Sequence, residues 1–141
     1  MVRDLTPGEI VNQFFSAARF AGERPVTNIV LMGTGEPLSN YNAVKKFVGT
    51  ATDRCGFGFS PKKVTLSTCG LAPMIERLAD DNVAVSLAVS LNATTDAIRD
   101  RIMPVNKAYP VKRLMEAVRY YGKRTGRSVT IEYVLFKGLN D

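Results

Sequence analysis

The chain has 141 residues, a length that supports one folded domain with its own hydrophobic core. Apolar residues make up 45% and charged residues 23%, and no apolar run approaches the roughly 20 residues of a membrane span. Histidine is absent, which excludes imidazole acid–base groups, triads and metal ligands within this sequence. The net charge of +6 weakly favours a polyanionic partner, and the two cysteines favour a reducing, cytoplasmic environment over a disulfide framework.

The hydrophobic periodicity predicts a helix near the N-terminus and several more along the chain. Thr6-Pro7-Gly8-Glu9 is a capping box with proline at the first helical position, and apolar residues then recur at helical spacing until Gly22. The apolar residues of this first helix are Ile10, Phe14, Ala17, Ala18 and Ala21. Later helices are predicted after Ser39 or Asn40, from Pro73, after Thr94 or Thr95, and around Val111–Tyr121.

Four mostly apolar runs between these helices predict strands, at 26–32, 63–67, 83–89 and 128–135. Strands that alternate with helices indicate βαβ units and a parallel sheet, so this is an α/β protein. The run 83–89 is almost continuously apolar, which is typical of a strand covered on both faces.

Small and polar residues follow three successive predicted strands, at Gly33–Pro37, Ser67–Gly70 and Ser90–Asn92. Any one such turn is most simply explained as turn chemistry. Because the carboxyl ends of parallel strands meet at one edge, however, all three turns are expected to lie together where ligands of such folds bind. The sequence therefore predicts a ligand site at this edge.

The first of these turns, Gly33-Thr34-Gly35-Glu36-Pro37, fits a dinucleotide-binding loop poorly. Glu36 would face the phosphates with a negative charge, and Pro37 removes an amide donor. A carboxylate at this point suits a ligand with a positive group, such as an amino-acid ammonium. A plain helix-start or loop carboxylate is an equally good interpretation of Glu36.

Six short segments occur in a recognisable order and at sensible spacing: Asp4–Ile10, Met32–Leu38, Val64–Gly70, Leu87–Ala93, Met103–Lys107 and Ile131–Leu135. Together they closely resemble the dual-specificity rRNA/tRNA adenine carbon-2 methyltransferases, which are radical S-adenosylmethionine (radical SAM) enzymes. The resemblance extends over residues 1–141 and is more specific than any single motif. It implies that these residues form one incomplete radical SAM core domain.

The resemblance implies a partial (βα) barrel with parallel strands and outer helices, without the family's first strand and its C-terminal units. It also implies contacts to the cofactor S-adenosylmethionine by the residues that match family motifs: Gly35, Glu36, Ser67, Ser90, Leu91 and Asn92. Gly35 and Glu36 match a Gly-Glu-Pro motif that contacts the amino group of the cofactor. Some members have histidine where this chain has Asn92, and asparagine cannot become cationic.

Cysteine is where the sequence departs from the family, whose members anchor a [4Fe–4S] cluster with a Cys-x3-Cys-x2-Cys loop just before the first helix. Here the first cysteine is Cys55, and Cys69 follows it on another element. Clusters of this kind need several thiolates. We therefore predict no metal ligand and no catalytic residue in this chain, and we expect this segment alone to be inactive and marginally folded.

In full-length members the implied reaction is radical methylation of carbon-2 of an adenine in 23S rRNA and tRNA, by a cytoplasmic protein without a membrane partner. We expect a monomer. The basic residues that could contact RNA phosphates are Lys62, Lys63, Arg99, Arg101, Lys107, Lys112, Arg113, Arg119, Lys123, Arg124 and Arg127. A solvated helix face explains those at 112–127 equally well.

Two alternatives remain open at the level of sequence. One is a non-catalytic α/β module that binds a nucleoside or RNA. The other is a conventional dinucleotide-type or closed-shell methyltransferase fold, which Pro37 makes awkward.

Overall fold

The computed structural model describes residues 3–141, and within them the strands form one parallel sheet in the order β1-β2-β3-β4. The strands are β1 (Ile29–Leu31), β2 (Val64–Thr68), β3 (Ser86–Ser90) and β4 (Val129–Glu132). Neighbours in the sheet are also neighbours in the sequence, and each pair is parallel. The predicted α/β class and parallel sheet are confirmed.

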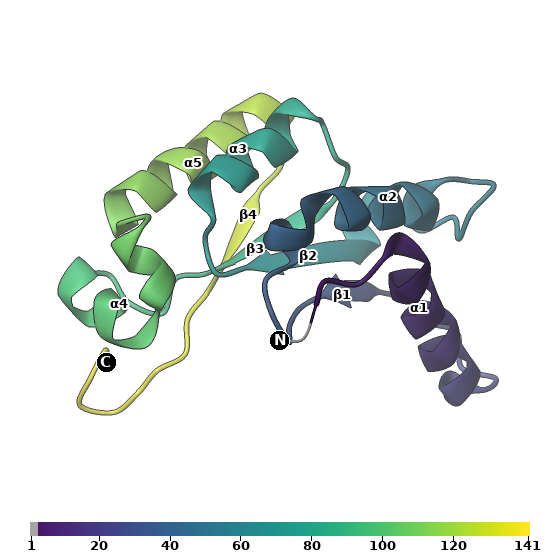
Figure 1. The fold of residues 1–141 in the computed structure, drawn as a ribbon, viewed down its shortest axis with the longest axis horizontal. Helices are drawn as coiled ribbons and strands as arrows, with labels where there is room; N and C mark the ends of the chain where they lie inside the picture. Colours follow the sequence, from purple (N-terminus) through teal and green to yellow (C-terminus); the bar gives the residue numbers. More distant parts are fainter. Residues whose placement is uncertain (1–2) are drawn as a thin grey trace.

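Helices connect the strands, and α2, α3 and α5 lie along one face of the sheet (Figure 1). A sequential strand order with crossover helices on one side is the arrangement of a (βα) barrel wall. A dinucleotide-binding sheet instead reverses its strand order and carries helices on both faces. The dinucleotide-type alternative is therefore wrong. The α-helices are α1 (Pro7–Ala21), α2 (Tyr41–Thr52), α3 (Ala72–Asp80), α4 (Asp96–Ile102) and α5 (Val111–Thr125), and the 3-10 helices are η1 (Pro37–Asn40), η2 (Pro61–Lys63) and η3 (Pro104–Lys107).

The core lies between the sheet and these helices. Helices α2, α3 and α5 contribute large side chains that are almost fully buried, such as Phe47 from α2, Ile75 from α3 and Leu114 from α5. Burying one such side chain stabilises the fold by about 1.5–3 kcal/mol. Tyr121 of α5 is also fully buried, and its hydroxyl donates to the carbonyl of Val85 at 3.1 Å, so its polar end is satisfied.

The two faces of the sheet differ in chemistry. Side chains alternate along a strand, and residues in register share a face. Leu66 and Leu87 are in register and belong to the core under the helices. Ser67 is therefore on the opposite face, as are Ser90 and its register partner Glu132. The side chains on the face without helices are thus polar near the carboxyl edge of the sheet.

The first helix follows the predicted bounds but packs less than its periodicity indicates. The capping box is present, with the Thr6 side chain accepting from the Glu9 amide and the Glu9 side chain accepting from the Thr6 amide. Only Ile10 is buried in α1, and Phe20 is 93% exposed. Figure 1 shows this helix beside β1, apart from the layer formed by α3 and α5.

Strands β1, β3 and β4 are shorter than predicted, β2 is shifted by one residue, and local hydrogen bonds explain where the shorter strands begin and end. The ladder of β1 begins at Ile29, whose register partner Val64 is the first residue of β2. Before β3, the Val83 amide bonds to the Leu78 carbonyl at 3.2 Å, so residues 83–85 close the end of α3 instead of joining the sheet. After β4, the backbone leaves the ladder and its next contacts are with the turn after β3.

No helix within residues 3–141 has the length and apolarity to cross a bilayer.

Candidate functional site

The turn after β1 begins the candidate site at the carboxyl edge of the sheet. Gly35 has φ +117°, which side-chain-bearing residues rarely adopt, so glycine is required there. Glu36 follows as the N-cap of η1, and one carboxylate oxygen, Oε1, accepts from the Leu38 amide at 2.9 Å. Its other oxygen, Oε2, accepts from the Cys69 amide at 2.7 Å. Glu36 therefore ties the turn after β1 to the turn after β2.

These contacts confirm the helix-start interpretation of Glu36. A carboxylate has about four acceptor positions, and the two amides use one on each oxygen. The remaining lone pairs leave room for a further donor. The contact of Glu36 with a cofactor ammonium thus stays a prediction.

Ser67 and Ser90 meet on one carboxylate. Ser67, near the end of β2, donates to Glu132 Oε2 at 2.9 Å, and Ser90, at the end of β3, donates to the same oxygen at 3.0 Å. Glu132 is the last residue of β4. The structure therefore brings the two predicted serines together through a residue that was not singled out from the sequence.

Asn92 is occupied by contacts within the chain. Its side-chain oxygen accepts from the Val134 amide at 3.0 Å, and its backbone carbonyl accepts from Asn140 Nδ2 at 2.6 Å. Its φ is +56°, a left-handed conformation that asparagine tolerates better than most residues. The neighbouring Leu91 is half-buried against the core. Both residues lie at the predicted edge, and Asn92 fixes the segment after β4.

A buried guanidinium donates hydrogen bonds to the backbone of the turns at the same edge. Arg99 of α4 is 0% exposed and donates to the carbonyls of Cys69 at 2.8 Å, Ser90 at 3.3 Å and Leu91 at 3.0 Å. Burial lowers the pKa of Arg99. It also donates to Asn106 Oδ1 at 2.9 Å.

The expectation that Arg99 contacts RNA phosphate is therefore wrong, because the side chain is enclosed and its donors are used. The charge is compensated indirectly, since Asn106 donates to the carboxylates of Asp96 at 3.0 Å and Asp100 at 2.7 Å. Leaving such a buried cation without partners would be costly.

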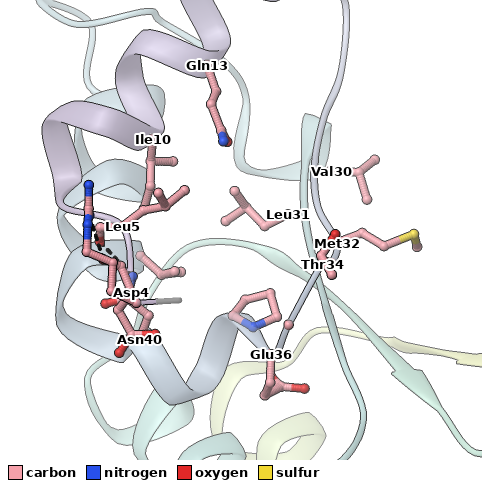
Figure 2. A pocket seen from close by; sticks show the side chains of 15 residues that line it. Asp4, Leu5, Ile10, Gln13, Val30, Leu31, Met32, Thr34, Glu36 and Asn40 are labelled. Carbon is pink, nitrogen blue, oxygen red and sulfur yellow. Dashed lines mark hydrogen bonds between the residues drawn. The ribbon is translucent and has the colours of Figure 1, made fainter. Parts of the chain in front are cut away.

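A cavity of about 420 Å³ lies between α1 and β1. Figure 2 shows Ile10, Gln13 and Leu31 around it, with Glu36 at its lower end and its carboxyl group pointing away from Gln13. Gly35 and Glu36 line this cavity. The other predicted cofactor residues, Ser67, Ser90, Leu91 and Asn92, are not among its lining residues, so they share the edge of the sheet but not this cavity.

The cysteines do not form a metal site. Cys55 is exposed in the loop after α2, and Cys69 is half-buried after β2. Burial and then the neighbouring Glu36 raise the pKa of the Cys69 thiol to about 12, which opposes the thiolate that iron requires. Within residues 3–141 no group of three or more Cys, Asp or Glu side chains could hold a metal ion. The residues present therefore do not fit a [4Fe–4S] cluster.

Sequence reasoning missed the roles of Glu132 and Arg99. An acidic residue at the end of an otherwise apolar strand was a usable signal for Glu132, because its position matches the edge where the other strands end. Arg99 gave no comparable signal, since it lies among charged residues on a short helix.

Four parallel strands in sequence order, with helices on one face and polar residues at the carboxyl edge of the other, define a segment of a (βα)-barrel enzyme wall. The chain belongs to the radical SAM superfamily, whose family model matches residues 2–141. The family resemblance read from the sequence is thereby confirmed.

Two relatives that are similar in sequence are RNA methyltransferases by name. The chain is 47% identical over 140 residues to the probable dual-specificity RNA methyltransferase RlmN of Desulforudis audaxviator, covering 99% of this chain and 44% of that protein. It is 48% identical over 141 residues to the protein of the same name from Pelotomaculum thermopropionicum, covering 100% of this chain and 38% of that protein.

A crystal structure of a radical SAM methyltransferase from Sphaerobacter thermophilus matches with a TM-score of 0.94 and 47% identity, over 100% of this chain and 42% of that one. The expected radical SAM fold is confirmed by this match. The chain spans about two-fifths of the length of the relatives it matches.

Proposed function

We propose that this chain is the central, cofactor-binding part of a dual-specificity RNA methyltransferase that methylates carbon-2 of adenine in 23S rRNA and tRNA. The observation that carries the proposal is the 47% identity over 140 residues to a relative of that name. Identity of this extent spans every strand of the sheet and every turn at its carboxyl edge.

The cofactor in this proposal is S-adenosylmethionine, which supplies the methyl group. The carboxyl edge fits such a ligand, because it combines a glycine turn that lets the backbone approach closely with hydrogen-bonding groups from several strands. Gly35 and Glu36 contact the amino-acid end of the cofactor. The carboxyl ends of β2 and β3 and the turn after β3 contact the cofactor through Ser67, Ser90, Leu91 and Asn92. The iron–sulfur ligands are supplied by residues outside this chain.

RNA is the second partner in the proposal. Exposed basic side chains on α5, such as Lys112, Arg119 and Lys123, support contact with a phosphate backbone. Arg113 is less available, because it forms a two-pronged contact with Glu76 at 2.6 and 2.7 Å. We also propose that the protein acts as a monomer in the cytoplasm, without a membrane partner.

A chimaera tests the proposed function directly. This chain replaces the matching 140 residues of the Desulforudis audaxviator protein, and 2-methyladenosine in 23S rRNA and tRNA is measured by mass spectrometry. We expect methylation of carbon-2, lost in a chimaera with Glu36→Ala and kept with Lys46→Ala, an exposed residue on α2. A folded chimaera that binds its iron–sulfur cluster but does not methylate RNA contradicts the proposal and favours a non-catalytic binding module.

A further inference from the structure

We propose that a cavity at the amino ends of β2, β3 and β4 is a second ligand site, which binds a phosphate group through Lys62, Arg127 and three serine hydroxyls. The volume of this cavity is about 660 Å³, within the range of pockets that hold small molecules. The inference does not depend on the proposed methylation, because it concerns a different end of the sheet.

The cavity lies at the opposite end of the sheet from the candidate cofactor site. Lys62 belongs to η2, which leads directly into β2, Ser86 is the first residue of β3, and Ser128 directly precedes β4. Strand β2 has five residues, and a strand rises about 3.3 Å per residue, so the two ends of the sheet are roughly 15 Å apart. A ligand in this cavity is therefore separate from one at the carboxyl edge.

The end of α5 places Arg127 at the cavity. Gly126 has φ +68°, and its amide donates to the Gly122 carbonyl at 2.9 Å, so the helix ends there and the chain turns towards β4. Arg127 is half-buried, and its Nη1 lies 3.5 Å from the Val83 carbonyl, at the outer limit of a hydrogen bond. Because a guanidinium has five N–H donors, most of them remain available to a ligand.

The positive charge of the cavity is not neutralised by acidic side chains. No Asp or Glu lines it, and no ion pair within residues 3–141 includes Lys62 or Arg127. The basic face of α5 differs, since Arg113 there pairs with Glu76. A cleft lined by one sign of charge concentrates ions of the opposite sign. The cavity therefore favours an anion.

Three hydroxyl groups from separate segments complete the set of donors, and they belong to Ser60, Ser86 and Ser128. Ser60 is the N-cap of η2, but its side chain makes no capping hydrogen bond, so its hydrogen is free to turn towards a ligand. Ser86 is on the face of the sheet without helices, because the next residue, Leu87, belongs to the core. Each hydroxyl can donate one hydrogen beside the two cationic groups.

A phosphate group matches this set of donors better than a carboxylate does. Several acceptor oxygens surround its phosphorus atom, so it can meet the planar fork of an arginine, a lysine ammonium and serine hydroxyls together. Pro61 and Val85 supply the apolar side chains of the lining, so recognition depends on charge more than on apolar contact. The phosphate belongs either to a small phosphorylated molecule or to an RNA backbone, and the experiment separates these two sources.

Calorimetry at constant ionic strength tests the site with inorganic phosphate. The anion is titrated into the 141-residue chain, into Lys62→Gln and Arg127→Gln, and into the control Lys46→Gln, which removes the same charge from an exposed position of α2. We expect one-site binding to the wild type and the control. The two cavity variants should bind at least about 10-fold more weakly, because each loses a hydrogen bond between charged partners. Arg127→Lys keeps the charge without the planar fork and should bind with intermediate affinity.

A single-stranded RNA without terminal phosphates identifies the source of the phosphate. Its affinity is measured at several salt concentrations, and each lost phosphate contact should reduce the slope of log affinity against log salt by about 0.7. If the RNA backbone occupies the cavity, Lys62→Gln shows this reduction and inorganic phosphate competes with the RNA. If a small phosphorylated molecule occupies it, the RNA slope is the same in Lys62→Gln and Lys46→Gln while inorganic phosphate binds as expected. Both results support the site.

Two results overturn the inference: no saturable phosphate binding by the folded wild-type chain, or equal phosphate binding by Lys62→Gln and Lys46→Gln. Circular dichroism identifies a variant that has not folded, and Lys62 is exposed, so its replacement decides even where the half-buried Arg127 cannot be replaced. If the wild-type chain does not fold alone, the same titrations are made on the chimaera. Methylation by the chimaera reports on the proposed function separately.

Discussion

Glu36 Oε2 accepts a hydrogen bond from the Cys69 amide at 2.7 Å, although the two residues lie 33 positions apart. The contact joins the turn after β1 to the turn after β2. Since the other oxygen of Glu36 caps η1 at Leu38, one side chain sets the geometry of both turns. The proposed cofactor contact of Glu36 thus depends on a carboxylate that already has a structural task.

Replacing Glu36 with alanine is expected to destabilise the chain by about 1–3 kcal/mol, because two backbone amides lose a charged acceptor. Urea unfolding followed by circular dichroism measures the change. Glu36→Gln keeps one acceptor oxygen and should lose clearly less. Equal stability of Glu36→Ala and the wild type would mean that these amides find water instead.

The Cys69 thiol is expected to react slowly in the folded chain. Its pKa, raised to about 12 by burial and by Glu36, makes its thiolate fraction on the order of a thousand-fold smaller than that of an ordinary thiol with a value of 9.0. In Cys55→Ser, alkylation of Cys69 should be at least about a hundred-fold slower than after unfolding in urea. Alkylation of exposed Cys55 in Cys69→Ser provides the comparison. Similar rates for the two cysteines would contradict this environment.

Replacement by alanine should change the stability of the fold in opposite directions at Gly70 and Gly49. Gly70 has φ +108°, and an added Cβ would lie 3.0 Å from Leu114 Cδ1 and 3.3 Å from Arg99 Nη2, so Gly70→Ala should cost about 1–3 kcal/mol. Gly49 lies in α2 with nothing within 4 Å of an added Cβ, so Gly49→Ala should stabilise by about 0.5–1 kcal/mol. Thermal unfolding measures both changes: the unfolding temperature should fall for Gly70→Ala and rise for Gly49→Ala.

The Arg3–Glu9 pair should make stability depend on acid pH. The Arg3 side chain, followed by the Thr6 backbone, lowers the pKa of Glu9 from 4.5 to about 2. A carboxyl whose pKa is lower in the folded than in the unfolded state stabilises the fold above the unfolded value. That stabilisation is lost as the pH falls from 4.5 to about 2. The difference in unfolding free energy between wild type and Glu9→Gln should shrink over this range, and a constant difference would show that the pair does not form in solution.

Much of the fold was predictable because its signals are local. The capping box at Thr6–Glu9 fixes where α1 begins, and the mostly apolar runs between the predicted helices located every strand. Strand ends were less predictable, because they depend on partners. Val83 is apolar enough for a strand, yet its amide closes the end of α3. Such competition between a helix end and a ladder involves residues distant in the sequence.

The site was partly predictable for a related reason. Ser67 and Ser90 were found because both follow apolar runs that end at one edge. The carboxylate that joins them comes from a strand more than 40 residues further along the chain, so no local pattern links it to either serine. Arg99 is harder still, since charge in a helix normally indicates solvent, and only the structure shows it enclosed.

The contacts of Arg99 with three backbone carbonyls have a thermodynamic consequence for any ligand at this edge. The loops are held in place before a ligand arrives, so little chain entropy remains to be lost on association. The site should therefore be preorganised. The main free-energy cost of binding a ligand there should be the desolvation of polar atoms, because the polypeptide is already ordered.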